Sequence, residues 1–435
     1  MPDNKIPAAM ITAPGSGQGK SMVTAALARL HRNAGRNVRV FKHGPDYLDP
    51  MVLEVASGNP VYQLHPWMTG EEECRWRLAE AAQSADLILV EGSMGLFDGS
   101  PSSGDLAKLA GIPALPVIDA KGMAQTFGAV ALGLARFDSE LPVHQVIANK
   151  IGSPYHGELL RESLPEGISL LGAIPRNDAM NIPDRHLGLV QAAEMDDLSD
   201  RLDKAAEVLM SAGLDVLPEP VSFHYEAPSR PEQLLAGYRI AVARDAAFSF
   251  IYRANLDLLT AMGAELVYFS PLTDSEVPMA DALWLPGGYP ELHASILAEN
   301  LAMLASIRAF HQAGKPILAE CGGLMACAEE LADKDGKVHS LLGLVPGRAT
   351  MANRLTALGL QSLETQLGGL RGHTYHHSSL ETPWQPAARA KKQAGSEGEA
   401  VYRDQKLVAS YFHGYFPSAP ALISAIFRGE EVRFS

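Results

Sequence analysis

The chain has 435 residues with 50 acidic and 36 basic side chains, which gives a formal net charge of −14 at pH 7. This length calls for two or three domains of ordinary size and excludes a single small module. A net charge this negative, without a run of Lys or Arg, argues against a surface that binds the phosphate backbone, so we expect no nucleic-acid partner.

The cysteine content and the apolar runs indicate where the protein works. Its three cysteines are too few for a disulfide framework and lack the spacing of a structural zinc site. The first residues do not form an export signal, and Gly, Pro or charged residues interrupt every later apolar run before about 18 residues. We therefore expect a cytoplasmic protein with no membrane-spanning segment.

The N-terminal half alternates short apolar runs with longer amphipathic stretches, which is typical of an α/β fold with parallel strands covered by helices. The helical spacing of Ala, Leu and Arg predicts helices at 21–33 and 71–82. The predicted strands are 8–13, 38–41, 87–91, 114–119, 143–148 and 170–174.

A glycine-rich loop follows the first predicted strand and precedes a helix. Its glycines let successive backbone N–H groups face one anion at the helix N-terminus. Lys20 can reach terminal phosphates and the Ser21 hydroxyl can ligate Mg²⁺, although Pro14 stands where the strict phosphate-loop pattern has Gly. The predicted phosphate-binding residues are Gly15, Ser16, Gly17, Gln18, Gly19, Lys20 and Ser21.

Polar residues follow three further predicted strands. Asp46 and Asp49 lie in KHGPDYLDP, and Glu91 ends a buried strand, where open α/β sheets bind ligands. We expect Asp49 and Glu91 to ligate Mg²⁺, and Asp98 in the next glycine-rich loop to face the metal or a substrate. Alternatively, Asp49 only caps the next helix and the glycines beside Asp98 only make turns. Asn149 can pair with an adenine edge or serve a local turn.

Segment 213–235 is rich in proline and lacks periodicity, so we place an interdomain linker there, between domains at 1–212 and 236–435. A second α/β pattern then begins, and the charged segment 387–399 is expected to be a solvated loop. The predicted strands of this half are 239–243, 265–269, 282–285 and 316–319.

Cys321 lies between a predicted strand and a helix and is followed by Gly-Gly, which is typical of a nucleophile elbow. We expect the helix N-terminus to favour the thiolate. The N–H groups of Gly322 and Gly288 are the predicted oxyanion donors. Cys327 is expected to be an inert buried cysteine.

A thiol nucleophile needs a base, and His413 in SYFHGYF is the strongest candidate because it follows an apolar strand. His373, His376 and His377 compete with it, and the segment that holds them is either substrate-facing or an ordinary polar loop. No acid stands at a fixed offset to orient His413, so we predict a dyad.

Seven motifs resemble, in the same order, those of the cobyrinate or hydrogenobyrinate a,c-diamide synthase family of corrinoid glutamine amidotransferases. They are APGSGQGKS, KHGPDYLDP, EGSMGLFDG, LPGGYPELHA, AECGGLM, RGHTYHHS and YFHGYF, and they span nearly the whole chain. The resemblance implies a dethiobiotin-synthetase-like domain that binds ATP and the corrinoid, followed by a class I, triad-type glutamine amidotransferase domain of flavodoxin-like α/β fold. It implies ATP-dependent amidation of the a and c acetates of the corrin ring with L-glutamine or ammonia, in cobalamin biosynthesis.

The same resemblance implies a role for each matched residue. Loop 15–21 would hold ATP, and Asp46 and Asp98 would face the acyl phosphate or the corrinoid carboxylate. Cys321 would be the glutaminase nucleophile, and His413 would raise its nucleophilicity. Because free ammonia is mostly ammonium at pH 7, we expect a shielded path for the nitrogen. The implied magnesium ligands are Ser21, Asp49 and Glu91.

Two alternatives stay open on the sequence. Another tetrapyrrole amidase, such as cobyric acid synthase or nickel-sirohydrochlorin a,c-diamide synthase, shares both domains, and the number of amides added per ring would separate it. A regulatory P-loop ATPase with an inactive amidotransferase domain should lack the nucleophile, which this chain has at Cys321. A homodimer is expected from the fold type alone.

Overall fold

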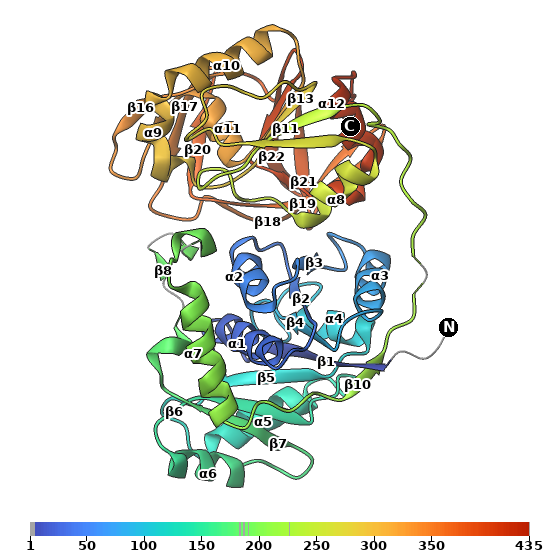
Figure 1. The fold of residues 1–435 in the computed structure, drawn as a ribbon, viewed down its shortest axis with the longest axis vertical. Coiled ribbons are helices and arrows are strands. Elements are labelled where there is room, and N and C mark those ends of the chain that lie inside the picture. Colours follow the sequence, from blue (N-terminus) through green and yellow to red (C-terminus); the bar gives the residue numbers. More distant parts are fainter. Residues whose placement is uncertain (1–4, 182–183, 186–187, 190, 226, 435) are drawn as a thin grey trace. The chain divides into compact units, whose positions relative to one another are not determined.

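The computed structural model describes residues 5–181, 184–185, 188–189, 191–225 and 227–434. The chain divides into two compact units, Met1–Pro228 and Ser229–Ser435, which we call the N-terminal and C-terminal units. Each unit builds its own sheet and core (Figure 1). Within the described residues, no helix has the length and apolar character needed to span a membrane.

The N-terminal unit is built on a parallel sheet with the strand order β3-β2-β4-β1-β5-β6-β7. The order places β1 in the middle, so the loop after β1 opens at the centre of the carboxyl edge of the sheet. The strands are β1 Lys5–Thr12, β2 Val38–His43, β3 Tyr62–Leu64, β4 Leu87–Glu91, β5 Ala114–Asp119, β6 Gln145–Ile151, β7 Ser169–Pro175, β8 Asp184–Arg185, β9 Gly188–Leu189 and β10 Pro220–Ser222.

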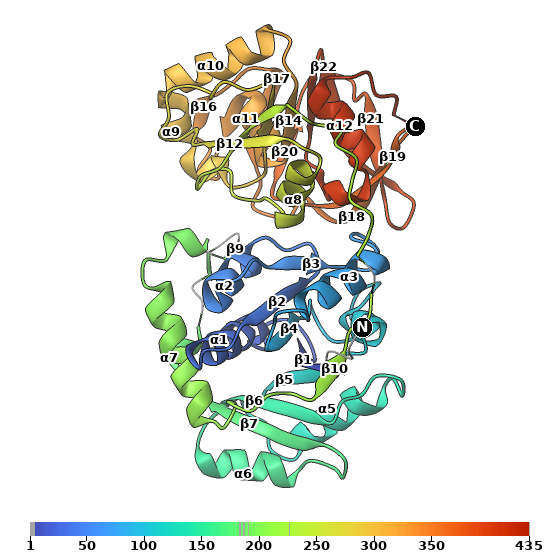
Figure 2. The same cartoon turned by 45° about the vertical axis from the view of Figure 1, so that its right-hand side comes forward.

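Helices cover both faces of this sheet. α1, α2 and α7 pack together on one face, where Ala, Leu and Val of these helices meet the strands in a continuous core, and α3 and α4 lie on the other (Figure 2). The helices are α1 Lys20–Asn33, α2 Leu48–Ser57, α3 Glu71–Ala81, α4 Ser103–Ala110, α5 Thr126–Arg136, α6 Pro154–Glu162 and α7 Leu198–Ser211, with 3-10 turns η1 Asp178–Met180 and η2 Ala192–Glu194.

The strands and helices predicted for this half all occur, with ends that shift by a few residues. The short strand β3 was not predicted, because a run of three residues carries too little periodicity. The segment predicted as a linker also contains structure, since β10 pairs antiparallel with β1. The domain boundaries inferred from the sequence stay a prediction.

The C-terminal unit holds a mixed sheet with the order β12-β11-β13-β14-β23-β22-β21-β18-β19-β24 and a second sheet, β16-β15-β17-β20. β11 to β14 and β23 pair in parallel, so their carboxyl ends share one edge. The strands are β11 Arg239–Ala243, β12 Glu265–Phe269, β13 Ala282–Leu285, β14 Ile317–Glu320, β15 Ala328–Ala332, β16 Val338–Ser340, β17 Val345–Met351, β18 Ala357–Thr365, β19 Gly368–His376, β20 Ser378–Glu381, β21 Ala388–Lys392, β22 Glu397–Asp404, β23 Leu407–Ser410 and β24 His413–Gly414.

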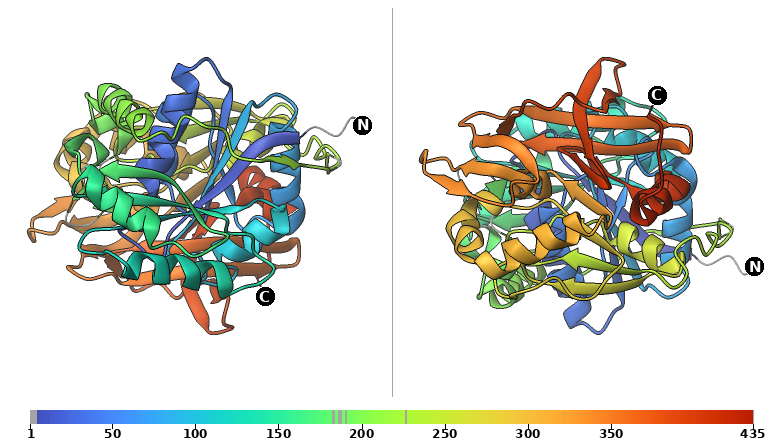
Figure 3. Two further views of the ribbon diagram at one scale, coloured as in Figure 1. Left: turned by 90° about the horizontal axis from the view of Figure 1, so that it is seen from below. Right: turned by 90° about the horizontal axis from the view of Figure 1, so that it is seen from above.

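Alternation along the parallel strands gives this unit two cores. Leu283, Leu285 and Ile317 face α9, α10 and α11, whereas Trp284 and Leu318 face α8 and α12. The right-hand view of Figure 3 shows α10 in orange and α12 in red on different sides of the strands. The helices are α8 Arg253–Ala261, α9 Ala294–Glu299, α10 Leu301–Gln312, α11 Gly322–Cys327 and α12 Pro420–Arg428, with 3-10 turns η3 Pro290–His293 and η4 Phe416–Ser418.

The prediction of a solvated loop at 387–399 is wrong. The segment forms β21 and the start of β22, which pair as an antiparallel hairpin. Ala390 is buried while Arg389 and Lys391 are exposed, so the charges occupy the solvent side of an alternating strand. The prediction failed because the exposed residues of this strand are charged and its buried residue is the small Ala390, so the sequence shows no clear alternation of apolar and polar side chains.

Candidate functional site

The glycine-rich loop lies between β1 and α1. Gly19 precedes α1 with φ 93°, a left-handed conformation that a side chain would strain, and a Cβ there would lie 2.4 Å from Asn149 Nδ2. Asn149 Nδ2 donates to Gln18 O at 2.9 Å, and Gln18 Oε1 accepts from Asp119 N at 2.8 Å. The ends of β5 and β6 therefore hold the loop in place, and the Asn149 amide is engaged with the loop.

Lys20 begins α1 and turns back over the loop. Its Nζ donates to Met94 O at 2.6 Å and to Gly15 O at 3.4 Å. Burial and then the positive charge of Lys42 lower the pKa of Lys20. The Lys20 ammonium thus donates hydrogen bonds to two backbone carbonyls, and phosphate oxygens could take the place of these acceptors.

A second buried lysine, Lys42, organises the carboxylates and was not predicted. Its Nζ lies 2.6 Å from Asp49 Oδ2 and 3.0 Å from Glu91 Oε1. Ser21 Oγ donates to the same Glu91 oxygen at 2.5 Å. The structure therefore brings the three predicted magnesium ligands together around one cation. Lys42 stands near the end of β2, and a charged residue at the carboxyl end of a buried strand was the signal that could have found it.

The electrostatics of this cluster follow from burial and opposite charge. Burial would lower the pKa of Lys42, but Asp49 and Glu91 outweigh it and raise that pKa. Burial likewise opposes ionisation of Asp49, yet the Lys42 ammonium holds the pKa of Asp49 below its ordinary value. Burial and then the Asp49 charge raise the pKa of Glu91. The single Lys42 ammonium therefore does not neutralise the negative charges of both Asp49 and Glu91 when both are ionised.

The oxygen donors at this point suit Mg²⁺. Asp49 Oδ1 and Glu91 Oε2 are buried and accept no hydrogen bond among the described residues. Mg²⁺ commonly uses one or two carboxylates together with water and phosphate oxygens, and it prefers hard oxygen ligands such as these and the Ser21 hydroxyl. Among the described residues, no group of three His, Cys, Asp or Glu forms a self-sufficient metal cage, so phosphate oxygens would have to complete the shell.

The other two predicted acids lie beside this cluster with different tasks. Asp46 Oδ1 accepts from the backbone N–H groups of Leu48 and Asp49, at 2.7 and 3.2 Å, so Asp46 rather than Asp49 caps α2. Asp98 Oδ2 accepts from Gly95 N at 2.9 Å within its own loop, and its side chain is exposed.

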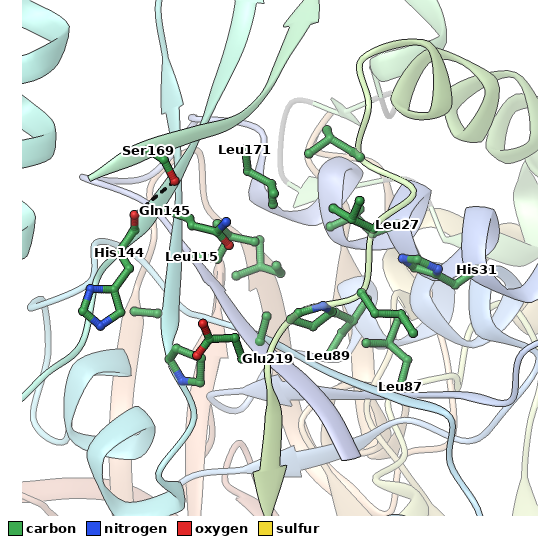
Figure 4. Close-up of a pocket in the computed structure, with 18 of the residues that line it drawn as sticks. Leu27, His31, Leu87, Leu89, Leu115, His144, Gln145, Ser169, Leu171 and Glu219 are labelled. Atoms are coloured by element: carbon green, nitrogen blue, oxygen red, sulfur yellow. Dashed lines mark hydrogen bonds between the residues drawn. The ribbon is translucent and has the colours of Figure 1, made fainter. Parts of the chain in front are cut away.

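A cavity of the N-terminal unit lies away from these residues. It measures about 730 Å³ and opens between the strand starts and the segment 214–219 (Figure 4). Leu87, Gln145 and Ser169 in its lining are the first residues of β4, β6 and β7, at the edge opposite the phosphate loop. None of the predicted site residues lines it.

In the C-terminal unit, Cys321 occupies the sharp turn between β14 and α11. Its φ of 47° and ψ of −101° are strained for a residue with a side chain, as in a nucleophile elbow. Its N–H donates to Ser410 O at 2.7 Å, which anchors the turn to β23. Cys327, by contrast, is fully buried in the core at the end of α11.

The two predicted oxyanion donors lie against each other. A Cβ on Gly322 would stand 2.9 Å from the Gly288 backbone N, so only glycine allows this approach. The loops after β13 and β14 therefore present Gly288 and Gly322 at one place beside the thiol.

The helix N-terminus favours the Cys321 thiolate through the Gly322 N–H, but this contribution is smaller than the opposing effect of burial. Burial and then the charge of Glu291 raise the pKa of Cys321, and this outweighs the Gly322 N–H that lowers it. α11 has only six residues, so its N-terminus carries little charge. The thiol is therefore protonated at neutral pH and needs a base.

His413 lies in the core on β24, directly opposite His373 of β19. The two rings stack with centroids 5.0 Å apart and planes 15° apart, and Tyr252 Oη lies 2.9 Å from His373 Nδ1. Burial and then His373 and His376 hold the pKa of His413 well below its ordinary value. A neutral imidazole can accept the thiol proton.

The histidine-rich segment is not the polar loop that was one of its two interpretations. His373 and His376 lie on β19 and are buried, and His377 follows directly. His376 Nε2 lies 3.2 Å from Glu399 Oε1, and its ring stacks on Tyr411 at 3.9 Å. His373 packs on the predicted base, whereas His376 has its own acidic partner.

Comparison with protein families gives two matches that follow the two units. Residues 9–190 match the CobQ/CobB/MinD/ParA nucleotide binding domain. Residues 239–421 match the CobB/CobQ-like glutamine amidotransferase domain. The first range holds the glycine-rich loop and the acidic cluster, and the second holds Cys321 and His413.

Curated relatives are similar over almost the full length. The hydrogenobyrinate a,c-diamide synthase of Stutzerimonas stutzeri is 57% identical over 98% of this chain and 100% of its own. That of Pseudomonas aeruginosa is 55% identical over 98% of both chains. The cobyrinate a,c-diamide synthase of Herminiimonas arsenicoxydans is 47% identical over 99% of this chain and 98% of its own. The chain therefore belongs to the cobyrinate and hydrogenobyrinate a,c-diamide synthase family.

Proposed function

We propose that this enzyme amidates the a and c acetate carboxylates of cobyrinate or hydrogenobyrinate, with ATP to activate each acid and glutamine to supply the nitrogen. The observation that carries the proposal is that one chain joins a charged phosphate-loop site with a nucleophile elbow, and that the turn at Gly287 and Gly288 packs against both His413 and the elbow residue Gly322. A carboxylate does not react with ammonia at neutral pH, and each unit would remove one half of that obstacle.

In the N-terminal unit, ATP would bind at residues 15–21, with support from Asn149. Phosphoryl transfer to the corrinoid carboxylate would give an acyl phosphate, and Lys20 and Lys42 would stabilise the charge on the transferred group. Asp98 is proposed to face the substrate, and Asp46 to position the α2 turn beside it. The domain limits proposed for this arrangement are 1–212, 213–235 and 236–435.

Mg²⁺ is proposed to lie between Ser21, Asp49 and Glu91. When bound, it would neutralise charge on the phosphate oxygens during transfer. The Lys42 ammonium contacts both carboxylates, so we expect it to move toward the phosphates when the metal is present. The unpaired oxygens of Asp49 and Glu91 support this assignment.

In the C-terminal unit, His413 would take the proton of Cys321 as the sulfur attacks the glutamine amide carbon. The Gly288 and Gly322 N–H groups would stabilise the resulting oxyanion. His413 would return the proton to the leaving ammonia, and water would then cleave the thioester to glutamate. The low pKa of His413 and the raised pKa of Cys321 support a neutral pair that transfers its proton only during attack.

Product analysis tests the proposal. Cobyrinate and hydrogenobyrinate are each incubated with ATP, Mg²⁺ and glutamine, and the mass of the ring is followed. We expect two amides per ring and two glutamates released. One amide, or more than two, would contradict a,c-diamide synthesis, and no amidation of either ring would point to an amidase of another tetrapyrrole such as nickel-sirohydrochlorin. No glutamate release would point to an ATPase with an inactive amidotransferase domain.

Two further properties are proposed. The protein is expected to work in a reducing cytoplasm, which agrees with three buried cysteines that are not paired in disulfides. A homodimer is expected from the fold type, and sedimentation at several concentrations would test it.

A further inference from the structure

Glu320, the residue directly before the nucleophile, makes contacts that the site described above does not use. It ends β14, and its side chain is 5% exposed. Its Oε1 accepts a hydrogen bond from the Gly414 backbone N–H at 2.7 Å, and its Oε2 accepts one from Trp284 Nε1–H at 2.8 Å. The carboxylate therefore links three strands, β13, β14 and β24.

The bond to Gly414 ties the elbow to the residue after the base. β14 and β23 pair as far as Glu320 and Ser410, where Cys321 N–H donates to Ser410 O. The chain then leaves β23 and returns as β24, which pairs with β19. His413 therefore lies on a short segment that is attached at both ends to the region of β14 and Cys321. One attachment is the hydrogen bond to Ser410 O, and the other is the hydrogen bond from Gly414 N–H.

The two hydrogen-bond partners of Glu320 match the acceptors of a carboxylate. Gly414 N–H and Trp284 Nε1–H are both donors, and a carboxylate has two acceptor oxygens for them. A glutamine would offer one acceptor and would place its NH₂ group against the other donor. Among the described residues, both hydrogen-bond partners of Glu320 are neutral N–H groups, and neither carries a positive charge. Burial of the ionised carboxylate therefore carries a desolvation penalty that no opposite charge offsets. Burial accordingly raises the pKa of Glu320 to about 7.

A second side chain supports the same backbone segment from α8. Asn255 Nδ2 donates to Gly414 O at 2.9 Å, and Asn255 Oδ1 accepts from Phe416 N at 2.8 Å. Both polar groups of Gly414 are therefore held by buried side chains. Such double support indicates that the position of this segment is fixed within a narrow range.

We propose that Glu320 is a positioning residue for glutamine hydrolysis. Its carboxylate fixes the His413–Gly414 backbone to the elbow strand and so sets where the imidazole lies relative to the Cys321 thiol. This inference rests on the proposed glutaminase function. It gives Glu320 the role of positioning His413, which it performs through the backbone N–H of Gly414 and not through a direct contact with the imidazole.

The experiment compares Glu320→Gln with the wild-type full chain. A glutamine-like diazoketone alkylates the active thiol, and the amount of label counts correctly folded sites. We expect kcat for glutamate release per labelled site to fall by about 10²-fold, since small misplacements of reacting groups have effects of this size. KM for glutamine should change by less than about threefold, because substrate binding is not altered. Amidation with high ammonium should stay at the wild-type rate.

Thr365→Val is the matched control, because the buried residue Thr365 also makes two hydrogen bonds, both partly buried. Its hydroxyl donates to Gly368 O at 2.8 Å and accepts from Leu367 N at 3.1 Å, at the turn between β18 and β19. It should keep the wild-type kcat per labelled site. A Glu320→Gln enzyme with fewer labelled sites but an unchanged kcat per site would overturn the proposal and leave Glu320 a purely structural residue. Absence of glutamate release by the wild type would instead refute the proposed function.

Two variants that keep other parts of the link extend the test if Glu320→Gln does not fold. Trp284→Phe retains the bond to Gly414, so it should keep most of its kcat per labelled site. Glu320→Asp withdraws the carboxylate by one methylene, so it should lose kcat at the same labelled fraction. Equal kcat values in these two variants would contradict the role given to the Gly414 bond.

Discussion

The two sites are built on the same kind of strand edge but are held by different forces. In the N-terminal unit, Lys42, Asp49 and Glu91 are buried charges that hold one another. In the C-terminal unit, burial keeps both Cys321 and His413 neutral, and hydrogen bonds to the backbone at Cys321 and Gly414 fix the segments that carry them. A site made of mutually compensating charges is sensitive to the loss of any member, whereas a neutral pair can lose its thiol without harm to the fold.

Cys321→Ala is the sharpest way to separate the two sites. Without the sulfur no thioester can form, so glutamine-dependent amidation should fall at least about 10⁴-fold. Amidation with high ammonium should stay near the wild-type rate, because the phosphate site is untouched. Rates with each nitrogen donor are measured on the same preparation. Loss of both activities in a folded variant would show that the sites are not independent.

Lys20→Ala should produce the opposite pattern. Removal of the cation that we propose stabilises the transferred phosphoryl group should lower amidation by about 10³-fold with both nitrogen donors. Glutamate release should persist, since the thiol site has its own proton acceptor. Parallel assays of amide product and glutamate decide this. Retained amidation would mean that the Gly15–Ser21 loop does not hold the reacting phosphate.

Lys42→Met tests the charge compensation directly. It leaves Asp49 and Glu91 buried together, so unfolding free energy should fall by about 3 kcal/mol and amidation by about 10²-fold. Lys108→Met is the control, because Lys108 pairs with Asp138 at a more exposed position. Denaturant unfolding and product formation are measured for both. Equal stability of the two variants would contradict the role assigned to Lys42.

Acid should weaken the N-terminal unit through a pair of buried histidines. His43 and His65 stack with centroids 5.3 Å apart, and burial lowers their pKa values to about 3 and about 4. The unfolded chain binds these protons near pH 6.5, so stability is retained above that pH and falls as the pH decreases toward 4. Each histidine should remove about 2 kcal/mol by pH 5. His65→Gln should show a smaller loss of melting temperature between pH 7 and 5 than the wild type, and an equal loss would refute this.

The sequence predicted the parts of each site that lie in one short segment. The loop Gly15–Ser21 and Cys321 follow predicted strands, and Glu91 ends one. Asp49 lies in the connection that leaves the predicted strand 38–41. The carboxyl ends of such strands are where α/β sheets bind ligands. Lys42 was missed because its role appears only when neighbouring strands bring two carboxylates to it. Glu320 was missed because its partner, Gly414, is a backbone group 94 positions away.

Antiparallel pairing explains most of the remaining differences. β18 and β19 pair along their length, and this hairpin places His373 opposite His413 through β24. The contact between His373 and His413 cannot be predicted from the spacing of residues within the histidine-rich segment, because His413 lies in a different strand. The raised pKa of the thiol likewise depends on burial and on carboxylates from other segments, which short-range patterns do not reveal.

The most direct test of the account follows nitrogen from one site to the other. Glutamine labelled with ¹⁵N in its amide is supplied with ATP, a corrinoid and excess unlabelled ammonium, and the product ring is weighed by mass spectrometry. We expect two amides per ring, both carrying ¹⁵N, which is the result for nitrogen that passes from Cys321 to the activated carboxylates without mixing with the solution. Amides that carry the isotope ratio of the bulk ammonium would contradict that transfer.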